Sequence, residues 1–378
     1  MVNDIQNKII IIGGGLIGEL LHLMLKSKGF EINHFAKALK IKNRTFALSP
    51  SSVDWLRSLG FPSSFFEALS EIKSMKIFDS SIKNSVTLDA EDVHKPALAY
   101  MVNEKDFNVA IKKTFNNEKN FKKLSTDFEI KTEQEQVILK FHNEEHKASI
   151  IIACDGANSM VREKIAINPL KHDFKQTALS FELKVKSEIQ KQAFQFFLKE
   201  SILAVLPIRK GLVSIVWSCD YQFFEKLNNL DDKSIENELN LIIGNYYKDI
   251  KIASKKEYFP LFMNSVESIF KDRVLLVGDA AHFIHPMAGQ GLNLGIRDII
   301  FLEKNIDKKD YMDIGLKGFL RKYERVRKED VSQMGFLTFG LNWIFSKKST
   351  IVIGMIEKGM SMLNKSKFLK QQLIKKAI

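Results

Sequence analysis

The chain has 378 residues and a formal net charge of +12, with 45% hydrophobic and 27% charged residues, which fits a globular protein with one large core or two coupled lobes. Its two cysteines, Cys154 and Cys219, exclude a disulfide framework, and their spacing predicts no metal site. The basic balance lacks the interleaved aromatic residues of nucleic-acid modules, so we expect no nucleic-acid partner.

The amino-terminal segment predicts a dinucleotide-binding turn. Lys8–Ile12 is an apolar strand, and Gly13, Gly15 and Gly18 follow it as G-x-G-x-x-G. The first glycine permits a tight turn, the second lets a pyrophosphate approach the backbone, and the third lets the helix pack on the strand. Apolar residues at helical spacing then continue to Gly29, which predicts the end of the helix.

The second strand, Phe30–Phe35, departs from the pattern of dinucleotide-binding folds. Such a strand usually ends in an acidic residue that holds the adenosine ribose hydroxyls, but Ala36 and Lys37 stand there. We therefore expect the ribose to be held by backbone or water.

The next segments predict two helices and the start of a second lobe. Ser51 or Ser52 is a candidate N-cap for a helix over Val53–Leu59. Strands over Ser74–Asp79 and Ser85–Leu88 belong to the smaller lobe, and a helix follows Asn103.

A second strand-to-helix junction lies over residues 149–162. The apolar run ends in Asp155 and Gly156, and Ser159 and Arg162 are one turn apart on the helix that follows. Residues 121–141 before it alternate as in a β-meander.

Residues 176–219 alternate in β fashion and predict an antiparallel sheet that forms a substrate lobe. Its aromatic residues Phe196 and Trp217 are candidates for the apolar wall of a substrate site, although most such residues fill cores. A helix over 231–247 follows.

The stretch Val274–Asp298 brings the most chemistry together. A buried strand ends in Gly278 and Asp279, the loop Pro286–Gly291 follows, and a helix starts near Asn293. The bare amides at such a helix end suit an electron-rich or anionic ligand atom.

This stretch resembles the second FAD-binding signature of class A flavoprotein monooxygenases, and among them the ubiquinone-biosynthesis hydroxylases, which residues 149–162, 193–217 and 259–261 also resemble. The resemblance implies FAD as cofactor and NAD(P)H as transient reductant. It implies that the cofactor is bound by Gly13, Gly15, Gly18, Arg44, Asn103, Asp155, Gly156, Gly278, Asp279, Pro286, Gly289, Gln290, Gly291 and Asn293. It also makes His285, Pro286 and Gly289 the candidate catalytic residues, with His285 assisting proton transfer or orienting the loop.

The resemblance further implies an α/β fold, with a doubly wound, Rossmann-like FAD domain of the glutathione-reductase type over 1–75, 97–172 and 265–330. An antiparallel β-sheet lobe over 76–96 and 173–264 is inserted into it, and a helical segment over 331–378 closes the chain. The implied reaction is aromatic hydroxylation through a flavin C4a-hydroperoxide, with oxygen as co-substrate and a lipid-soluble polyprenylated phenol of ubiquinone biosynthesis as substrate. Two alternatives stay open: hydroxylation of a small soluble aromatic compound, and a non-catalytic member of a quinone-synthesis assembly.

The carboxyl-terminal region permits two interpretations. Phe319–Asp330 is typical of a solvated charged helix, and residues 334–363 alternate apolar patches with lysines. They predict either a helical pair packed on the FAD domain or a surface that contacts lipid, and the basic tail, with Phe368, Leu369, Leu373 and Ile374 on one face, adds weight to the latter. The amino terminus has no secretory pattern and no uninterrupted apolar run spans a membrane, so we expect a cytoplasmic protein, with the inner face of the membrane and other quinone-synthesis proteins as partners.

Overall fold

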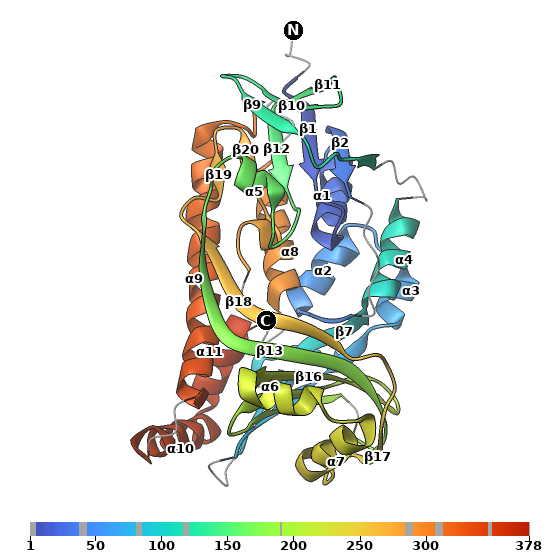
Figure 1. The fold of residues 1–378 in the computed structure, drawn as a ribbon, viewed down its shortest axis with the longest axis vertical. Coiled ribbons are helices and arrows are strands. Elements are labelled where there is room, and N and C mark those ends of the chain that lie inside the picture. Colours follow the sequence, from blue (N-terminus) through green and yellow to red (C-terminus); the bar gives the residue numbers. More distant parts are fainter. Residues whose placement is uncertain are drawn as a thin grey trace.

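The apolar strand predicted at Lys8–Ile12 is β1, and it lies inside a six-stranded sheet of order β19-β20-β12-β1-β2-β8 (Figure 1). The computed structural model describes residues 5–37, 44–80, 85–115, 121–189, 191–283, 290–306, 313–346 and 350–377. All strand pairs of this sheet are parallel except β19 with β20. Ile9–Ile11 of β1 are fully buried, as expected for a strand covered on both faces. The strands are β1 (Lys8–Ile12), β2 (Glu31–Ala36), β8 (Lys122–Lys123), β12 (Ile150–Ala153), β19 (Phe270–Lys271) and β20 (Val274–Leu276).

Helices and two small sheets complete this domain. A meander packs beside the sheet, and a second three-stranded sheet of order β3-β7-β4 lies between the domain and the lobe (Figure 1). The helices are α1 (Leu16–Ser27), α2 (Pro50–Ser58), α3 (Ser63–Glu67), α4 (Glu104–Thr114), α5 (Met160–Lys164), η2 (Gly278–Ala280), α8 (Gln290–Asn305) and α9 (Lys317–Ser346). The small sheets consist of β9 (Glu129–Thr132), β10 (Val137–Phe141) and β11 (Glu144–Ala148), and of β3 (Thr45–Leu48), β4 (Ser70–Ile72) and β7 (Ala99–Asn103).

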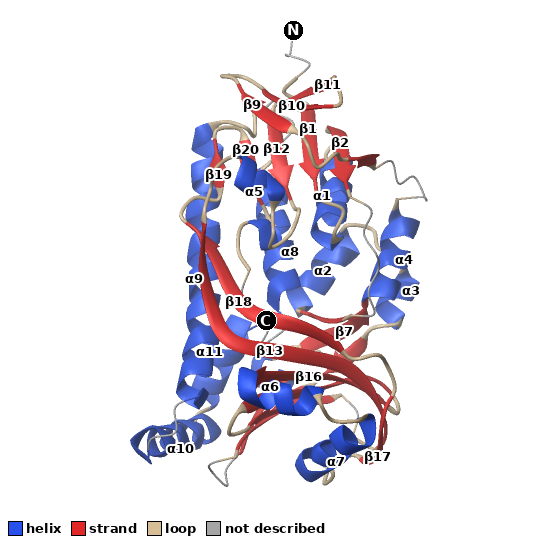
Figure 2. Ribbon diagram, viewed as in Figure 1, coloured by secondary structure: helices blue, strands red, loops and turns tan. Residues whose placement is uncertain are grey.

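The second lobe is an eight-stranded sheet, mostly antiparallel, and the predicted strands at 74–79, 85–88 and 176–219 belong to it. Two long curved strands, β13 and β18, run from the side of the six-stranded sheet into this sheet (Figure 2). Helices α6 (Tyr221–Asn228) and α7 (Asp232–Ile243) cover its outer face. The strands are β5 (Ser74–Asp79), β6 (Ser85–Asp89), β13 (Pro169–Lys186), β14 (Gln192–Phe197), β15 (Ser201–Arg209), β16 (Leu212–Asp220), β17 (Lys248–Ile252) and β18 (Glu257–Val266).

The carboxyl-terminal helices join the two parts. The boundary expected at residue 331 lies inside the continuous helix α9. The charged helix predicted over Phe319–Asp330 has a solvated face, but its other face is buried in the domain at Tyr323 and Arg327. Helices α10 (Thr350–Lys365) and α11 (Lys367–Ala377) pack on β6 and on the short helix η1 (Ala90–Val93) of the lobe. Ile374 is buried there against Val86 and Leu88, so only part of the apolar face predicted for the tail is exposed.

Two helix starts differ from the sequence-based expectation. The N-cap of α2 is Ser49, whose hydroxyl accepts a hydrogen bond from the Ser52 amide, because Pro50 occupies the first helical position, where its missing N–H costs nothing. Helix α8 is already helical at Gln290, three residues before the expected start at Asn293. Gly291 and Gly295 in α8 have low helix propensity, but Gly295 packs on Ile17 of α1, and this tertiary contact favours the helix.

Candidate functional site

Three chain segments that are distant in sequence meet at one edge of the six-stranded sheet. The strands β1, β12 and β20 are parallel neighbours, and they end at Ile12, Ala153 and Leu276. Their carboxyl ends therefore bring together the turn at Gly13, the junction at Asp155 and the turn at Gly278. In open α/β sheets this edge is where ligands bind.

The glycine turn after β1 is required by backbone crowding. Gly13 has φ +134°, and a Cβ there would collide with the Cys154 carbonyl of the neighbouring strand. A Cβ on Gly18 would collide with the Gly13 carbonyl, whereas Gly15 has nothing within 4 Å of its Cβ direction. The first and third glycines thus serve packing, and the second leaves open space over the amino end of α1, where a phosphate would bind.

Two histidines that the sequence did not single out support this turn. His34 on β2 is buried, and its Nε2 lies 2.8 Å from the Gly13 carbonyl oxygen. Its Nδ1 lies 3.1 Å from Nδ1 of His22 on α1. Burial, helped by the charge of Lys26, lowers the pKa of His22 to about 4, so His22 is neutral near pH 7. Through these contacts the two histidines tie the turn to β2 and α1.

Arg162 links the second junction to the third. Its guanidinium is buried and donates to the Ala157 carbonyl (2.8 Å) and to the Ala280 carbonyl (2.9 Å). Asp155 accepts a hydrogen bond from the Val161 amide through Oδ2, while its Oδ1 is buried without a partner among the described residues. Gly156 has φ +86° and no atom near its Cβ direction, so this junction also keeps room for a ligand.

Asp279 and Arg44 are distant in sequence but close enough in the fold for their charges to interact. Arg44 donates two hydrogen bonds of 2.9 Å to the carboxylate of Glu104. This bond raises the pKa of Arg44, and the charges of Glu257 and Asp279 raise it further. Burial raises the pKa of the partly exposed Asp279, and Gly291 lies beside its carboxylate. The sequence named Arg44 and Asp279 but gave Glu104 no role in holding Arg44.

A buried carboxylate that the sequence did not assign fixes the third junction. Asp298 on α8 is fully buried, and its Oδ2 accepts hydrogen bonds from the Gly278 amide (2.7 Å) and from His282 Nε2 (2.8 Å). Its Oδ1 accepts one from Arg327 Nε at 2.5 Å. Burial alone would raise the pKa of Asp298, but the opposing charges of His282 and Arg327 outweigh it and lower the pKa to about 2. Asp298 is thus ionised, and it holds the turn that carries Asp279.

The other predicted cofactor residues divide into three groups. Gln290 and Gly291 lie in the first turn of α8, with their backbone amides at a helix end, and Gly291 lies beside the Asp279 carboxylate. Asn293 and Asn103 have structural roles, because the Asn293 side chain bonds Ser49, Ser52 and Ala47, and Asn103 caps α4 through the Lys105 amide. His285, Pro286 and Gly289 lie outside the described residues.

Phe196 and Trp217, the candidates for the apolar wall of a substrate site, lie on the outer face of the lobe, away from the six-stranded sheet. Trp217 is fully buried and donates through Nε1 to Ser201, and Phe196 is buried in the same cluster, beneath Leu227 of α6 and Leu239 of α7. The face toward the FAD domain instead carries the residues that alternate with them. Period-two alternation separates the two faces of a strand, but the position of α6 and α7 decides which face is inner.

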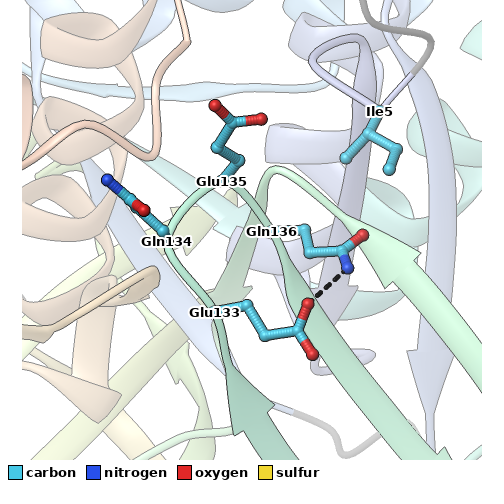
Figure 3. Close-up of a pocket in the computed structure, with 5 residues that line it drawn as sticks. All are labelled: Ile5, Glu133, Gln134, Glu135 and Gln136. Atoms are coloured by element: carbon cyan, nitrogen blue, oxygen red, sulfur yellow. Dashed lines mark hydrogen bonds between the residues drawn. The ribbon is translucent and has the colours of Figure 1, made fainter.

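Two of the hollows among the described residues bear on where the site lies. One of about 410 Å³ is lined by Ile5 and the β9–β10 turn at Glu133–Gln136 (Figure 3). It lies at the amino ends of the strands, opposite to the glycine turn, so it is not part of this site. The other, of about 110 Å³, lies between Thr45 of β3 and the inner face of the lobe.

Comparison with known proteins agrees with this geometry. Residues 6–334 match the family model described as FAD binding domain. The chain is 26% identical to ubiquinone biosynthesis monooxygenase COQ6, mitochondrial, of Dictyostelium discoideum, over 97% of this chain and 90% of that protein. It is 24% identical to 3-demethoxyubiquinol 3-hydroxylase of Escherichia coli strain K12, over 98% of each.

Solved structures show the same fold. The p-nitrophenol 4-monooxygenase PnpA from Pseudomonas putida DLL-E4 superposes with a TM-score of 0.75 at 16% identity, over 98% of this chain and 97% of that one. Klebsiella pneumoniae HpxO complexed with FAD and uric acid superposes with a TM-score of 0.74 at 16% identity, over 98% of this chain and 96% of that one. The expected doubly wound domain with an inserted sheet lobe is therefore confirmed.

The residues at the sheet edge fit FAD. The open space at Gly15 and the amino end of α1 suit a pyrophosphate, and the partly exposed carboxylate of Asp279 suits the hydroxyls of a ribityl chain. Strand β2 ends at Ala36, at the position where an acidic residue usually stands, so no carboxylate at that position holds the adenosine ribose.

Substitution of the two glycines separates packing from cofactor binding. We expect Gly18→Ala to lower the free energy of unfolding by about 1–3 kcal/mol, because its Cβ meets the Gly13 carbonyl. Gly15→Ala leaves the melting temperature of the FAD-free protein unchanged but lowers FAD affinity by about tenfold or more, since its Cβ fills only the ligand space. Thermal melts and fluorescence titration with FAD measure both. Equal loss of stability in the two variants would contradict this division.

Removing the partner of Asp298 tests the buried ion pair. We expect Arg327→Met to lower the free energy of unfolding by about 3–5 kcal/mol, because it leaves a buried carboxylate short of its cationic partner. Arg325→Met is the matched control, since Arg325 is exposed on the same helix. Denaturant titration of both variants is the measurement, and a similar small effect of the two would show that the pair does not hold the junction.

Proposed function

We propose that this chain, which belongs to the FAD binding domain family of flavin-dependent monooxygenases, hydroxylates the aromatic ring of a polyprenylated phenol in ubiquinone biosynthesis. The observation that carries the proposal is similarity over nearly the whole chain to ubiquinone-biosynthesis enzymes of distant organisms. NAD(P)H is the proposed reductant.

The residues of the chain have positioning and electrostatic roles in this proposal. Bound FAD supplies the oxygen-transfer chemistry, and the protein holds it and excludes water. Gly13, Gly15 and the amino end of α1 hold the pyrophosphate, and Asp279 holds the ribityl hydroxyls. The amides of Gln290 and Gly291 stabilise negative charge through the positive end of α8.

The lipid-soluble substrate requires access to a membrane surface. Among the described residues, no helix has both the length and the apolar composition to cross a bilayer. Helices α10 and α11 expose Met362 (61%) and Phe368 (65%) next to Lys358, Lys365 and Lys367, which are also exposed. Apolar side chains beside lysines fit an anionic lipid surface, so we propose peripheral binding through α10 and α11.

A comparison of lipid extracts tests the function. Deleting the gene is expected to lower the quinone content and to accumulate a prenylated precursor that lacks one ring hydroxyl. A gene copy with Glu188→Gln, an exposed substitution far from the sheet edge, restores the quinone, and one with Gly15→Ala restores it poorly. Unchanged quinones in the deletion strain would remove the ubiquinone role and favour a small soluble substrate.

Flotation with vesicles of anionic phospholipid tests the membrane surface. We expect Phe368→Ser to reduce the vesicle-bound fraction several-fold, because it removes an exposed apolar side chain from α11. Tyr221→Ser is the matched control, since Tyr221 is equally exposed (65%) on α6 of the lobe. A wild-type protein that stays unbound, or equal loss in both variants, would contradict binding through α11.

A further inference from the structure

The hollow of about 110 Å³ between the FAD domain and the lobe is lined mainly by polar residues, with Phe181 as the apolar exception. Thr45 contributes from β3, and Ser180, Glu182, Ser214 and Glu257 contribute from the lobe strands. An apolar cavity of about 150 Å³ is known to hold a benzene ring, so this smaller polar one suits the substituted edge of such a ring.

Strand register explains why these side chains gather. Glu182 of β13 is directly opposite Ser214 of β16, and Ser180 of β13 is directly opposite Glu257 of β18. Directly opposite residues point to the same face of a sheet, with Cβ atoms about 5 Å apart. Leu179 and Leu183, which alternate with them on β13, pack on the outer face in the cluster beneath α6 and α7.

Ser254 in the wall of this hollow accepts a hydrogen bond from the Glu182 amide at 2.9 Å, but three other polar side chains of the wall are not paired within the described residues. Ser214 is 5% exposed, yet its hydroxyl makes no hydrogen bond to a described residue. The carboxylates of Glu182 and Glu257 likewise make no hydrogen bond or ion pair within the described residues. Two carboxylates and one hydroxyl are thus free to bind the hydrogen-bonding groups of a ligand in this hollow.

The hollow borders the predicted cofactor site and is acidic. Thr45 follows Arg44, and the charges of both Glu257 and Asp279 act on the Arg44 guanidinium. Arg44 is already paired with Glu104, and the one ammonium on the wall, Lys255, is exposed. Two carboxylates against one solvated ammonium favour hydrogen-bond donors and disfavour an anionic group.

We propose that this hollow receives the hydroxyl-bearing edge of the substrate ring, and that Glu182 and Glu257 select a neutral phenol over an aromatic acid. The ring hydroxyls donate to the two carboxylates, and Ser214 completes the polar contacts. The inference rests on the proposed function and narrows its substrate class to phenols without a ring carboxylate.

Two probes that differ only in a carboxylate test the proposal on the FAD-loaded protein. We expect catechol to bind about tenfold or more tightly than 3,4-dihydroxybenzoate at neutral pH, as measured by the change in flavin fluorescence or by calorimetry. Glu182→Gln and Glu257→Gln, singly and together, are expected to reduce this preference to about threefold or less, and Ser214→Ala to weaken catechol binding. Glu188→Gln, an exposed glutamate outside the hollow, leaves the preference unchanged.

Each contrary result is informative. Equal affinity for the two probes, no binding of either, or a preference that survives both glutamine substitutions overturns the proposal. The single variants retain the test if the double variant does not fold, which thermal melts establish. Unchanged quinones in the deletion strain would overturn the ubiquinone role while leaving the probe preference intact, so the two failures are distinguishable.

Discussion

The buried carboxylate of Asp298 is the constraint on which the ligand edge of the sheet depends. An ionised side chain inside a protein costs several kcal/mol unless its oxygens are paired, and here His282, Arg327 and the Gly278 amide all donate to it. These donors come from the turn after β20 and from α9, so one side chain of α8 fixes three elements against each other. The turn that carries Asp279 is thereby held against α8 and α9.

The two faces of the lobe sheet differ in composition. Its outer face buries aromatic and aliphatic side chains beneath α6 and α7, and this apolar burial holds the sheet together. The inner face, toward β3, carries serines and glutamates that a purely structural sheet would not need. Strands hold polar side chains more precisely than loops do, and this precision suits the proposed role of positioning a ring beside a bound flavin.

The sequence predicted those features that depend on neighbours in the chain. The glycine turn, the junction at Asp155 and the strand before Gly278 are local patterns with one steric solution, so their positions were confirmed. The pairing of Asp298 with Arg327 joins two helices through tertiary packing, and no spacing rule indicates it. Likewise, alternation placed Phe196 and Trp217 on one face of the lobe, but only the docking of α6 and α7 shows that this face is the outer one. The cap at Ser49 was missed because Pro50 was not weighed as the first helical residue.

The central claim is that FAD held at this sheet edge transfers one atom of molecular oxygen to a neutral phenol beside it. Incubation of the FAD-loaded protein with NAD(P)H, oxygen-18 gas and the precursor isolated from deletion cells tests it most directly. The account predicts a product whose new ring hydroxyl carries one labelled oxygen atom by mass spectrometry. A product labelled from water, or oxidation of NAD(P)H with no oxygen in the ring, would contradict it.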